Sequence, residues 1–458
     1  MKNLISTIIL GVFFAMNIIS GQETFTLDEA IQYGIENQNS VKVQDLNIEN
    51  AEAEIKEVKS IGMPKVSGKV DYSYYYYTPQ QPVQDFISPT VYSILDAEGL
   101  PTTTQGPPAT FNIGFVQPHQ FTAGVSANML VFDGSYIYGL RAAKLYRELA
   151  KKQKDNEVVS VTNNITKAYL SILIAEENKA YIVDNITTVE KSLREVSAMY
   201  EEGFMESLDV DRTQLTYDNL TTQLENLNGI IELSYNLLKF QMNYPLDQEI
   251  QLGESIDDLI VKFEAQTITE ESIDPSNREE YKLLNLNQEL NQLNLKRYKA
   301  GYLPNVAAFT SYQESLQRAN LFDGNEAGFL PTGVVGLNIN VPIYDGGEKS
   351  AQIQKVKIDI QETDIQKQEF ERAMTLEVMN ARTNLQNARR SVANTEKNLQ
   401  TTQSIYDRTQ IKFREGVGSS VEVTQAEGSL FQAQSAYTSA LYDLLEAKVN
   451  LEIALGKL

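Results

Sequence analysis

Two carboxylates that occupy equivalent places in the sequence are the side chains best suited to chemistry. Asp209 lies six residues after Gly203, and Glu422 lies six residues after Gly416. A carboxylate near the start of a helix stabilises the positive end of the helix dipole, whereas a ring of carboxylates attracts cations. The residue types are compatible with both roles. Which role applies depends on the helices and turns that position the two acids.

The other reactive side chains exclude most enzyme chemistry. The 458 residues contain no cysteine and a single histidine, His119, which follows Pro118. Zinc sites and histidine-assisted nucleophiles need more of these residues than the chain has. The Gly346-Gly347 pair lacks the lysine of a phosphate-binding loop. We therefore expect no enzymatic activity, no cofactor and no metal site.

The two acids have equivalent places because the sequence repeats itself. Residues 200–203 (Tyr-Glu-Glu-Gly) return as residues 413–416 (Phe-Arg-Glu-Gly), at an offset of 213 residues. Residues 131–134 (Val-Phe-Asp-Gly) return as residues 343–346 (Ile-Tyr-Asp-Gly), at an offset of 212 residues. A repeat of nearly half the chain predicts an internally duplicated fold.

Each repeat predicts the same order of elements: a helix, a strand, a loop, a second strand, a long helix, a turn that we call a tip, and a shorter helix. The first repeat covers residues 22–244 and the second covers residues 279–458. Thr26 and Glu29 form the pattern of a capping box at the start of the first helix. Residues 245–278 are acidic and irregular, and we interpret them as a small side domain between the repeats.

Glycine, proline and aspartate mark the boundaries between helices and strands in both repeats. A glycine followed by a proline ends each first helix, and an Asp-Gly pair joins each second strand to the long helix, which the aspartate can cap. These turn residues are Gly62, Pro64, Asp133, Gly134, Gly301, Pro304, Asp345 and Gly346.

The segments after the prolines change to a period of two. Apolar or aromatic residues recur at every second position, between mostly polar or small ones, in residues 66–74, 121–131 and 335–343, whereas Phe309 breaks the pattern of the strand after Pro304. Segments of about ten residues with one apolar face are typical of transmembrane β-barrels. One such segment also fits a soluble strand, so the prediction depends on finding four. The loop at 79–118 holds seven of the 13 prolines and predicts a long surface loop outside the cell.

Four helices follow the strands. The long helices at 136–201 and 349–414 contain no proline, and each is followed by a shorter helix, at 207–243 and 420–456. A helix of 66 residues is roughly 100 Å long, so coiled-coil packing is expected. The apolar row of period seven in the second long helix is Val378, Leu385, Val392, Leu399, Tyr406 and Phe413. A second row of small residues indicates helices packed in a ring.

The N-terminal segment, the apolar runs and the net charge of the chain indicate where the protein resides. Lys2, an apolar run over residues 4–19 and the small residues after it predict a signal peptide at 1–21, with a membrane anchor as the alternative. No later apolar run reaches about 18 residues, so we expect no helix to cross a bilayer. The net charge of −22 argues against a nucleic-acid partner. Because four membrane strands cannot close a barrel alone, the chain must oligomerise.

The turns, tips and closing segment together resemble the TolC family of outer-membrane efflux proteins over essentially the whole mature chain. The resemblance is carried by the paired turns, by residues 423–427 (Val-Thr-Gln-Ala-Glu) and by residues 449–456. It implies a mixed α and β membrane protein, a homotrimer that forms a twelve-stranded β-barrel among outer-membrane lipids and a twelve-helix periplasmic α-barrel. It also implies a periplasmic adaptor (membrane fusion) protein, an inner-membrane pump of RND or ABC type, and the export of drugs, metals or proteins.

The resemblance assigns two roles to the tips. Residues at the turns would dock the adaptor: Gly203, Phe204, Met205, Gly416, Val417 and Gly418. Asp209, Glu422 and Gln425 would lie at the channel entrance, where three copies of Glu422 form a ring of charge. Arg212 and Gln425 stand where familiar members carry further acids, so we expect weaker blocking by cations.

Two other functions remain open. A passive outer-membrane porin explains the strands but not the long helices. A secreted coiled-coil protein with a structural or adhesive role explains the heptads but not the four strands.

Overall fold

The computed structural model describes residues 23–101, 109–265, 273–322 and 328–457. The predicted signal peptide, residues 1–21, therefore lies outside the described residues. The chain divides into two compact units. We call them the helical unit (residues 1–50, 147–288 and 361–458) and the sheet unit (residues 51–146 and 289–360). Each unit takes segments from both repeats.

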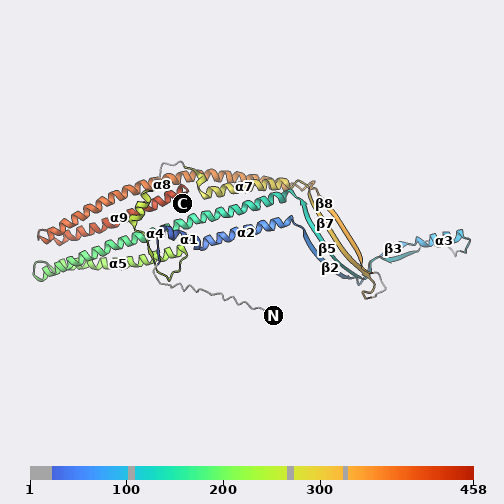
Figure 1. Ribbon diagram of the computed structural model, residues 1–458, viewed down its shortest axis with the longest axis horizontal. Helices are drawn as coiled ribbons and strands as arrows, with labels where there is room; N and C mark the ends of the chain where they lie inside the picture. Colours follow the sequence, from blue (N-terminus) through green and yellow to red (C-terminus); the bar gives the residue numbers. More distant parts are fainter. Residues whose placement is uncertain (1–22, 102–108, 266–272, 323–327, 458) are drawn as a thin grey trace, which may run out of the picture. The chain divides into compact units, whose positions relative to one another are not determined.

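The sheet unit holds one four-stranded antiparallel sheet. Its strands are β2 (Lys65–Tyr74), β5 (His119–Phe132), β7 (Asn305–Arg318) and β8 (Leu330–Asn340), in the order β2-β5-β7-β8. Figure 1 shows the four strands side by side in this order. The hairpins of the two repeats thus meet through β5 and β7, and β2 and β8 are the open edges of the sheet as described.

The strand register places the alternating apolar residues of all four strands on one face, which we call the apolar sheet face. Val66 pairs with Ala127, Ala127 with Thr310, and Thr310 with Val335, so that this face runs across the sheet. Most of its larger side chains are exposed, with Val335 84% accessible, whereas Leu316 of β7 is buried. A single copy of the chain leaves this apolar face uncovered.

Phe309, which breaks the alternation, lies on the opposite face. It pairs with Gly336 across β7 and β8, and a Cβ atom at Gly336 would lie 2.6 Å from the Phe309 ring. The ring therefore covers a glycine on the polar face. This cross-strand contact, rather than an irregular strand, accounts for the exception.

The loop at 79–118 contains more structure than the sequence predicts. Residues Gln80–Gln84 (β3) pair with residues Thr110–Gly114 (β4), and the helix α3 (Ile87–Ala97) lies between them. The carboxylate of Asp85 accepts hydrogen bonds from the backbone of Ile87 and Ser88, at 3.1 and 2.9 Å, and so provides partners for the first two N–H groups of this helix.

The helices have nearly the predicted bounds. They are α1 (Leu27–Asn37), α2 (Asn39–Ile61), α4 (Gly134–Glu201), α5 (Ser207–Met242), α7 (Glu279–Ala300), α8 (Glu348–Arg414) and α9 (Ser420–Ala454). The prediction of one continuous first helix is wrong, because Gln38 adopts an extended conformation between α1 and α2. Its side chain donates to the carbonyl of Gln241 at 2.8 Å, a contact with a distant segment.

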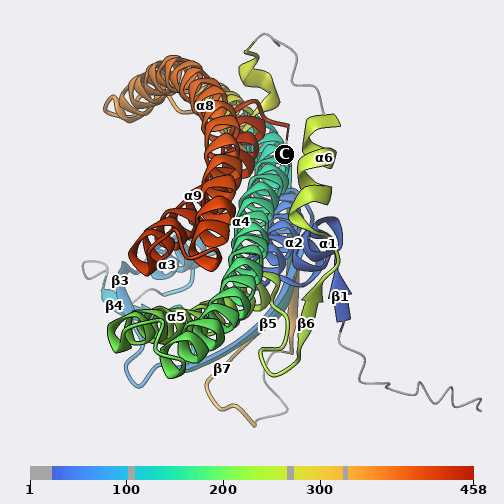
Figure 2. The same cartoon turned by 90° about the vertical axis from the view of Figure 1, so that its left-hand side faces the viewer.

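In the helical unit, the heptad residues form the core. Ile165, Leu170 and Ile172 of α4 pack with Leu238 of α5 and Leu445 of α9. A second cluster joins the apolar row of α8 to α9. In Figure 2, α5 runs beside α4 and α9 runs beside α8. One stretch of α4 is apolar and long enough to cross a membrane, but half of it is buried inside the protein, as expected of a core helix.

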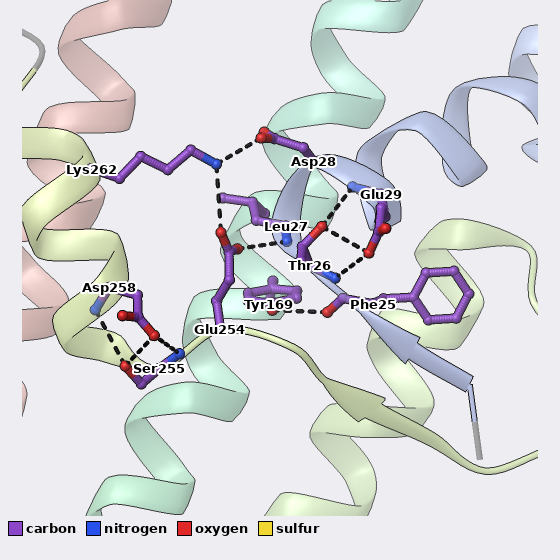
Figure 3. Close-up of polar contacts among 10 residues, drawn as sticks. All are labelled: Phe25, Thr26, Leu27, Asp28, Glu29, Tyr169, Glu254, Ser255, Asp258 and Lys262. Carbon is purple, nitrogen blue, oxygen red and sulfur yellow. Dashed lines mark hydrogen bonds and ion pairs between the residues drawn. The ribbon is translucent and has the colours of Figure 1, made fainter. Parts of the chain in front are cut away.

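The segment between the repeats is fastened to residues 23–29. The strand β6 (Ile250–Leu252) pairs in parallel with β1 (Glu23–Phe25), and the helices α6 (Ile256–Ala265) and η1 (Pro275–Asn277) follow. Figure 3 shows Glu254 accepting a hydrogen bond from the backbone of Leu27 at 2.8 Å, and Lys262 at 2.7 Å from Asp28. The predicted capping box of Thr26 and Glu29 is present in the same view.

Candidate functional site

The two tips close through the same turn. Gly203 has a φ of 81° and Gly416 a φ of 75°, which is the left-handed conformation that glycine adopts most easily. The next residue of each tip donates its backbone N–H to the preceding helix, from Phe204 to Met199 at 2.8 Å and from Val417 to Lys412 at 3.0 Å. This pattern is the Schellman motif that ends helices. Both tips thus carry a glycine because each turn requires a residue in the left-handed conformation.

Each tip presents two apolar side chains at equivalent positions. Phe204 and Val417 are 81% and 78% exposed, and Leu208 and Val421 are also exposed. Met205, which the sequence analysis grouped with the docking residues, is less accessible. Its side chain is half-buried and packs against a cluster of buried residues at the base of the tips.

That cluster, which we call the tip cluster, holds the two tips together. Its buried members are Val196 of α4, Tyr406 and Phe413 of α8, and Val423, Ala426 and Leu430 of α9. Met205 and Val210 of the first tip pack on it from outside. The helices α4, α8 and α9 therefore bury apolar residues at this point, and α5 contacts them through Val210.

The two equivalent acids have different surroundings. The Asp209 carboxylate accepts a hydrogen bond from the Ser420 hydroxyl, and it lies 3.8 Å from the Arg212 guanidinium. Asp209 thereby links the first tip to the first residue of α9. The place of Asp209 at a channel entrance stays a prediction.

Glu422 remains exposed in the first turn of α9. The Ser419 hydroxyl caps the helix by accepting a hydrogen bond from the Glu422 backbone at 3.2 Å. Gln425, one turn further on, is exposed as well. Of the predicted entrance residues, Glu422 and Gln425 thus share an accessible face of α9, whereas Asp209 belongs to a contact between the tips.

A row of polar residues buried between α4 and α9 joins the helices of the two repeats. The sequence analysis did not predict it. Asn185 of α4 donates a hydrogen bond to Gln434 of α9 at 2.7 Å, and Thr438 donates to Asn178 at 2.7 Å. Asn178 and Asn185 are seven residues apart. A polar residue repeated at the heptad spacing of an otherwise apolar seam was the available signal.

Glu427 is a second residue that the sequence analysis did not single out as functional. Its side chain is only 3% exposed, and one carboxylate oxygen, Oε1, is buried without a hydrogen-bond partner among the described residues. Burial raises the pKa of Glu427 to about 7, while the hydroxyl of Tyr406 partly opposes that rise.

The aspartates of the two Asp-Gly turns cap the long helices, as predicted. The Asp133 carboxylate accepts a hydrogen bond from the Tyr136 backbone at 3.0 Å, and the Asp345 carboxylate accepts one from the Lys349 backbone at 3.2 Å. The Lys349 ammonium also bonds to Asp345 and holds the pKa of that carboxyl below its usual value. Gly134 and Gly346 follow these two caps, and Gly346 has a φ of 69°.

The glycines and prolines at the other ends of the strands are structural in a similar way. A Cβ atom at Gly62 would lie 2.6 Å from the Tyr136 hydroxyl, so a larger residue at this position would have to displace the Tyr136 side chain. Gly301 donates its backbone N–H to Arg297 at 3.1 Å. Pro64 and Pro304 each stand directly before a strand, β2 and β7 respectively.

The side chains that the tips expose are suited to binding. Within the described ranges, no group of three or more His, Cys, Asp or Glu residues is placed to hold a metal ion. The tips offer exposed apolar side chains for a partner and an exposed carboxylate for cations.

Comparisons with known proteins agree on one family. The family model described as outer membrane efflux protein matches residues 30–242 and 283–457. The chain is 21% identical over 388 residues to the outer membrane protein TolC of Salmonella enteritidis, covering 78% of this chain and 74% of that protein. It is 21% identical over 349 residues to the TolC of Vibrio cholerae, covering 74% and 77%.

Solved structures share the fold. The outer membrane protein VceC of Vibrio cholerae has a TM-score of 0.68 at 15% identity, with 94% of this chain and 96% of that chain covered. A membrane protein from Pseudomonas aeruginosa has a TM-score of 0.72 at 15% identity, with 94% and 92% covered.

Proposed function

The chain belongs to the outer membrane efflux protein family, and from this membership we propose how its sheet and its tips serve export. It is an outer-membrane exit duct of a tripartite efflux system, and it extends from the outer membrane into the periplasm. Three copies combine their sheets into one twelve-stranded barrel and their helices into one tunnel. A periplasmic adaptor protein and an inner-membrane pump of RND or ABC type complete the path.

The sheet supports the barrel part of this proposal. Its apolar face is exposed across four strands, and β2 and β8 leave open edges. Unpaired strand edges are not tolerated in lipid, so copies must pair β2 of one with β8 of the next. The apolar sheet face then meets the lipid and the polar face lines the channel.

The equivalent apolar tips are the observation that carries the adaptor proposal. Phe204 and Leu208 on the first tip match Val417 and Val421 on the second, and all four are exposed. Apolar side chains held at a rigid turn suit a docking site for a partner helix, because they bury area at little cost in conformational entropy. The partner we propose is the helical hairpin of the adaptor.

Photo-crosslinking in cells tests this docking. A photoreactive residue at position 417 is expected to capture an adaptor, identified by mass spectrometry, whereas one at Arg390, exposed on α8 away from the tips, is not. Capture of neighbouring copies alone, in cells that express adaptors, would refute docking at the tips and favour a free-standing channel.

We further propose that three copies of Glu422 form the charged ring at the entrance, with Gln425 one turn behind. Glu422 is exposed and its backbone is capped by Ser419, which leaves the carboxylate free to face the axis. Glu422→Ala is expected to lower the cation-to-anion permeability ratio of single channels, because the ring loses three charges. An unchanged ratio would remove Glu422 from the ring.

A further inference from the structure

The buried carboxyl of Glu427 lies inside the packing that holds the tips together. Glu427 is five residues after Glu422 on α9, roughly 7 Å further along the helix axis. It follows Val423 by four residues and precedes Leu430 by three, so it shares the helix face that both residues bury in the tip cluster. Its exposed fraction of 3% shows that the carboxyl cannot reach water while this packing persists.

No cation compensates this carboxyl among the described residues. From α8, the Tyr406 hydroxyl is the polar group that acts on it, and Arg414 and Asp407 act in turn on Tyr406. From α4, Glu195 faces Tyr406 and pairs with Arg414 at 3.2 Å.

The first tip supplies no cation either. Its charged pair, Asp209 and Arg212, is engaged in the contact with Ser420. An ionised Glu427 would thus be a buried charge with one hydrogen-bonding hydroxyl and no ion-pair partner, which is strongly unfavourable.

We propose that Glu427 is a proton-controlled lock on the tunnel entrance. In its neutral form it lets α9 pack against α8 and α4, which keeps the tips together. In its ionised form it loosens the tip cluster, because the charge gains its hydration only when the helices separate. The lock rests on the proposed function, since it needs the tips to frame the entrance.

The direction of the pH effect follows from the two states. Packed, Glu427 has a pKa of about 7, and loosened it returns toward its ordinary value of 4.5. The packed state therefore holds its proton over a range where the loosened state has lost it. The free energy by which the bound proton favours the packed state is fully present below pH 4.5, falls as the pH rises, and is lost once the pH passes 7. Between pH 5 and pH 7 the ratio of loosened to packed entrances rises roughly 40-fold for each protomer.

Channel recordings test the lock on the full-length protein in planar bilayers between pH 5 and pH 8. The wild-type open probability is expected to rise with pH and to level off above about pH 7. Glu427→Gln is expected to keep a low open probability at every pH. Glu369→Gln, which removes an exposed carboxylate of α8 outside the tip cluster, serves as the matched control and is expected to keep the wild-type profile.

A second variant separates the lock from mere loss of packing. Tyr406→Phe removes the hydroxyl that favours the charged carboxyl, so the pH at which the wild-type curve levels off is expected to move upward. Leu430→Ala weakens the same cluster without touching the carboxyl, and is expected to raise the open probability at every pH.

Two results would overturn the lock: a wild-type open probability that does not change with pH, or a Glu427→Gln protein that keeps the wild-type pH dependence. Failure of every variant to form channels would instead count against the proposed function. In that case, amide hydrogen exchange of residues 423–430 still tests the lock, because it reports the loosening of α9 without a current.

Discussion

Replacing Glu427 by glutamine is expected to stabilise the packing of α9 near the tips. The carboxyl is 3% exposed, and its pKa of about 7 in the folded protein compares with an ordinary value of 4.5. One pKa unit corresponds to about 1.4 kcal/mol, so ionisation costs the packed state about 3 kcal/mol per protomer once the pH exceeds 7. Glutamine keeps the shape of the side chain and cannot ionise, so the variant avoids this cost.

Hydrogen exchange measured by mass spectrometry provides the assay. Peptides that cover residues 423–430 report opening of the tip cluster, once the rates are corrected for the intrinsic effect of pH on amide exchange. At pH 8 the variant is expected to be protected roughly 300-fold more than the wild type, and at pH 5 only about fourfold more. Asp443→Asn, at an exposed carboxylate of the same helix outside the reported peptides, is the control and is expected to change neither value.

Equal protection of wild type and variant at pH 8 would refute the reasoning. It would mean that the ionised carboxyl reaches water or a cation without disturbing the tip cluster. A gain of protection that is the same at pH 5 and pH 8 would equally contradict it, because the stabilisation would then arise from the amide group and not from the lost charge.

Three further substitutions test other parts of the structure. Ser420→Ala removes the hydroxyl that donates to Asp209, and a hydrogen bond to a charged group contributes about 1.5–3 kcal/mol. We therefore expect faster amide exchange in the first turn of α9, and unchanged exchange would contradict the contact. Gly416→Ala is expected to lower the free energy of unfolding by about 1–2 kcal/mol, because Gly416 has a φ of 75°. Gly428→Ala inside α9, where a Cβ meets open space, is expected to raise the free energy of unfolding. A loss of stability at both positions would refute the strain argument. Val335→Lys on the apolar sheet face is expected to destabilise the membrane-inserted protein by about 2–4 kcal/mol in denaturant titrations, and Asn338→Lys on the polar face by much less. If Asn338→Lys destabilised the protein more, the polar face would be the one that contacts lipid.

The elements with strong periodicity were predictable from the sequence. The long helices α4 and α8 begin and end within two residues of the predicted bounds, because a heptad row without proline admits no other regular structure. The repeated tip glycines and the capping aspartates were equally accessible, since a left-handed turn and a helix start each require particular residue types.

Features that depend on distant contacts were not predictable. The break at Gln38 is held by a hydrogen bond to Gln241, some 200 residues away in the chain, and the position of Phe309 is explained only by Gly336 on the neighbouring strand. The helix α3 inside the proline-rich loop was missed because eleven residues with a proline give a weak local signal.

For the candidate site, the sequence by itself determined the duplication, the tips and the equivalent places of Asp209 and Glu422. Tertiary structure alone decided that Asp209 bonds to Ser420 while Glu422 stays exposed, and that Glu427 is buried. The physical reason is that residue type and spacing set which face of a helix a side chain occupies, whereas its hydration and partners depend on the other helices packed against that face.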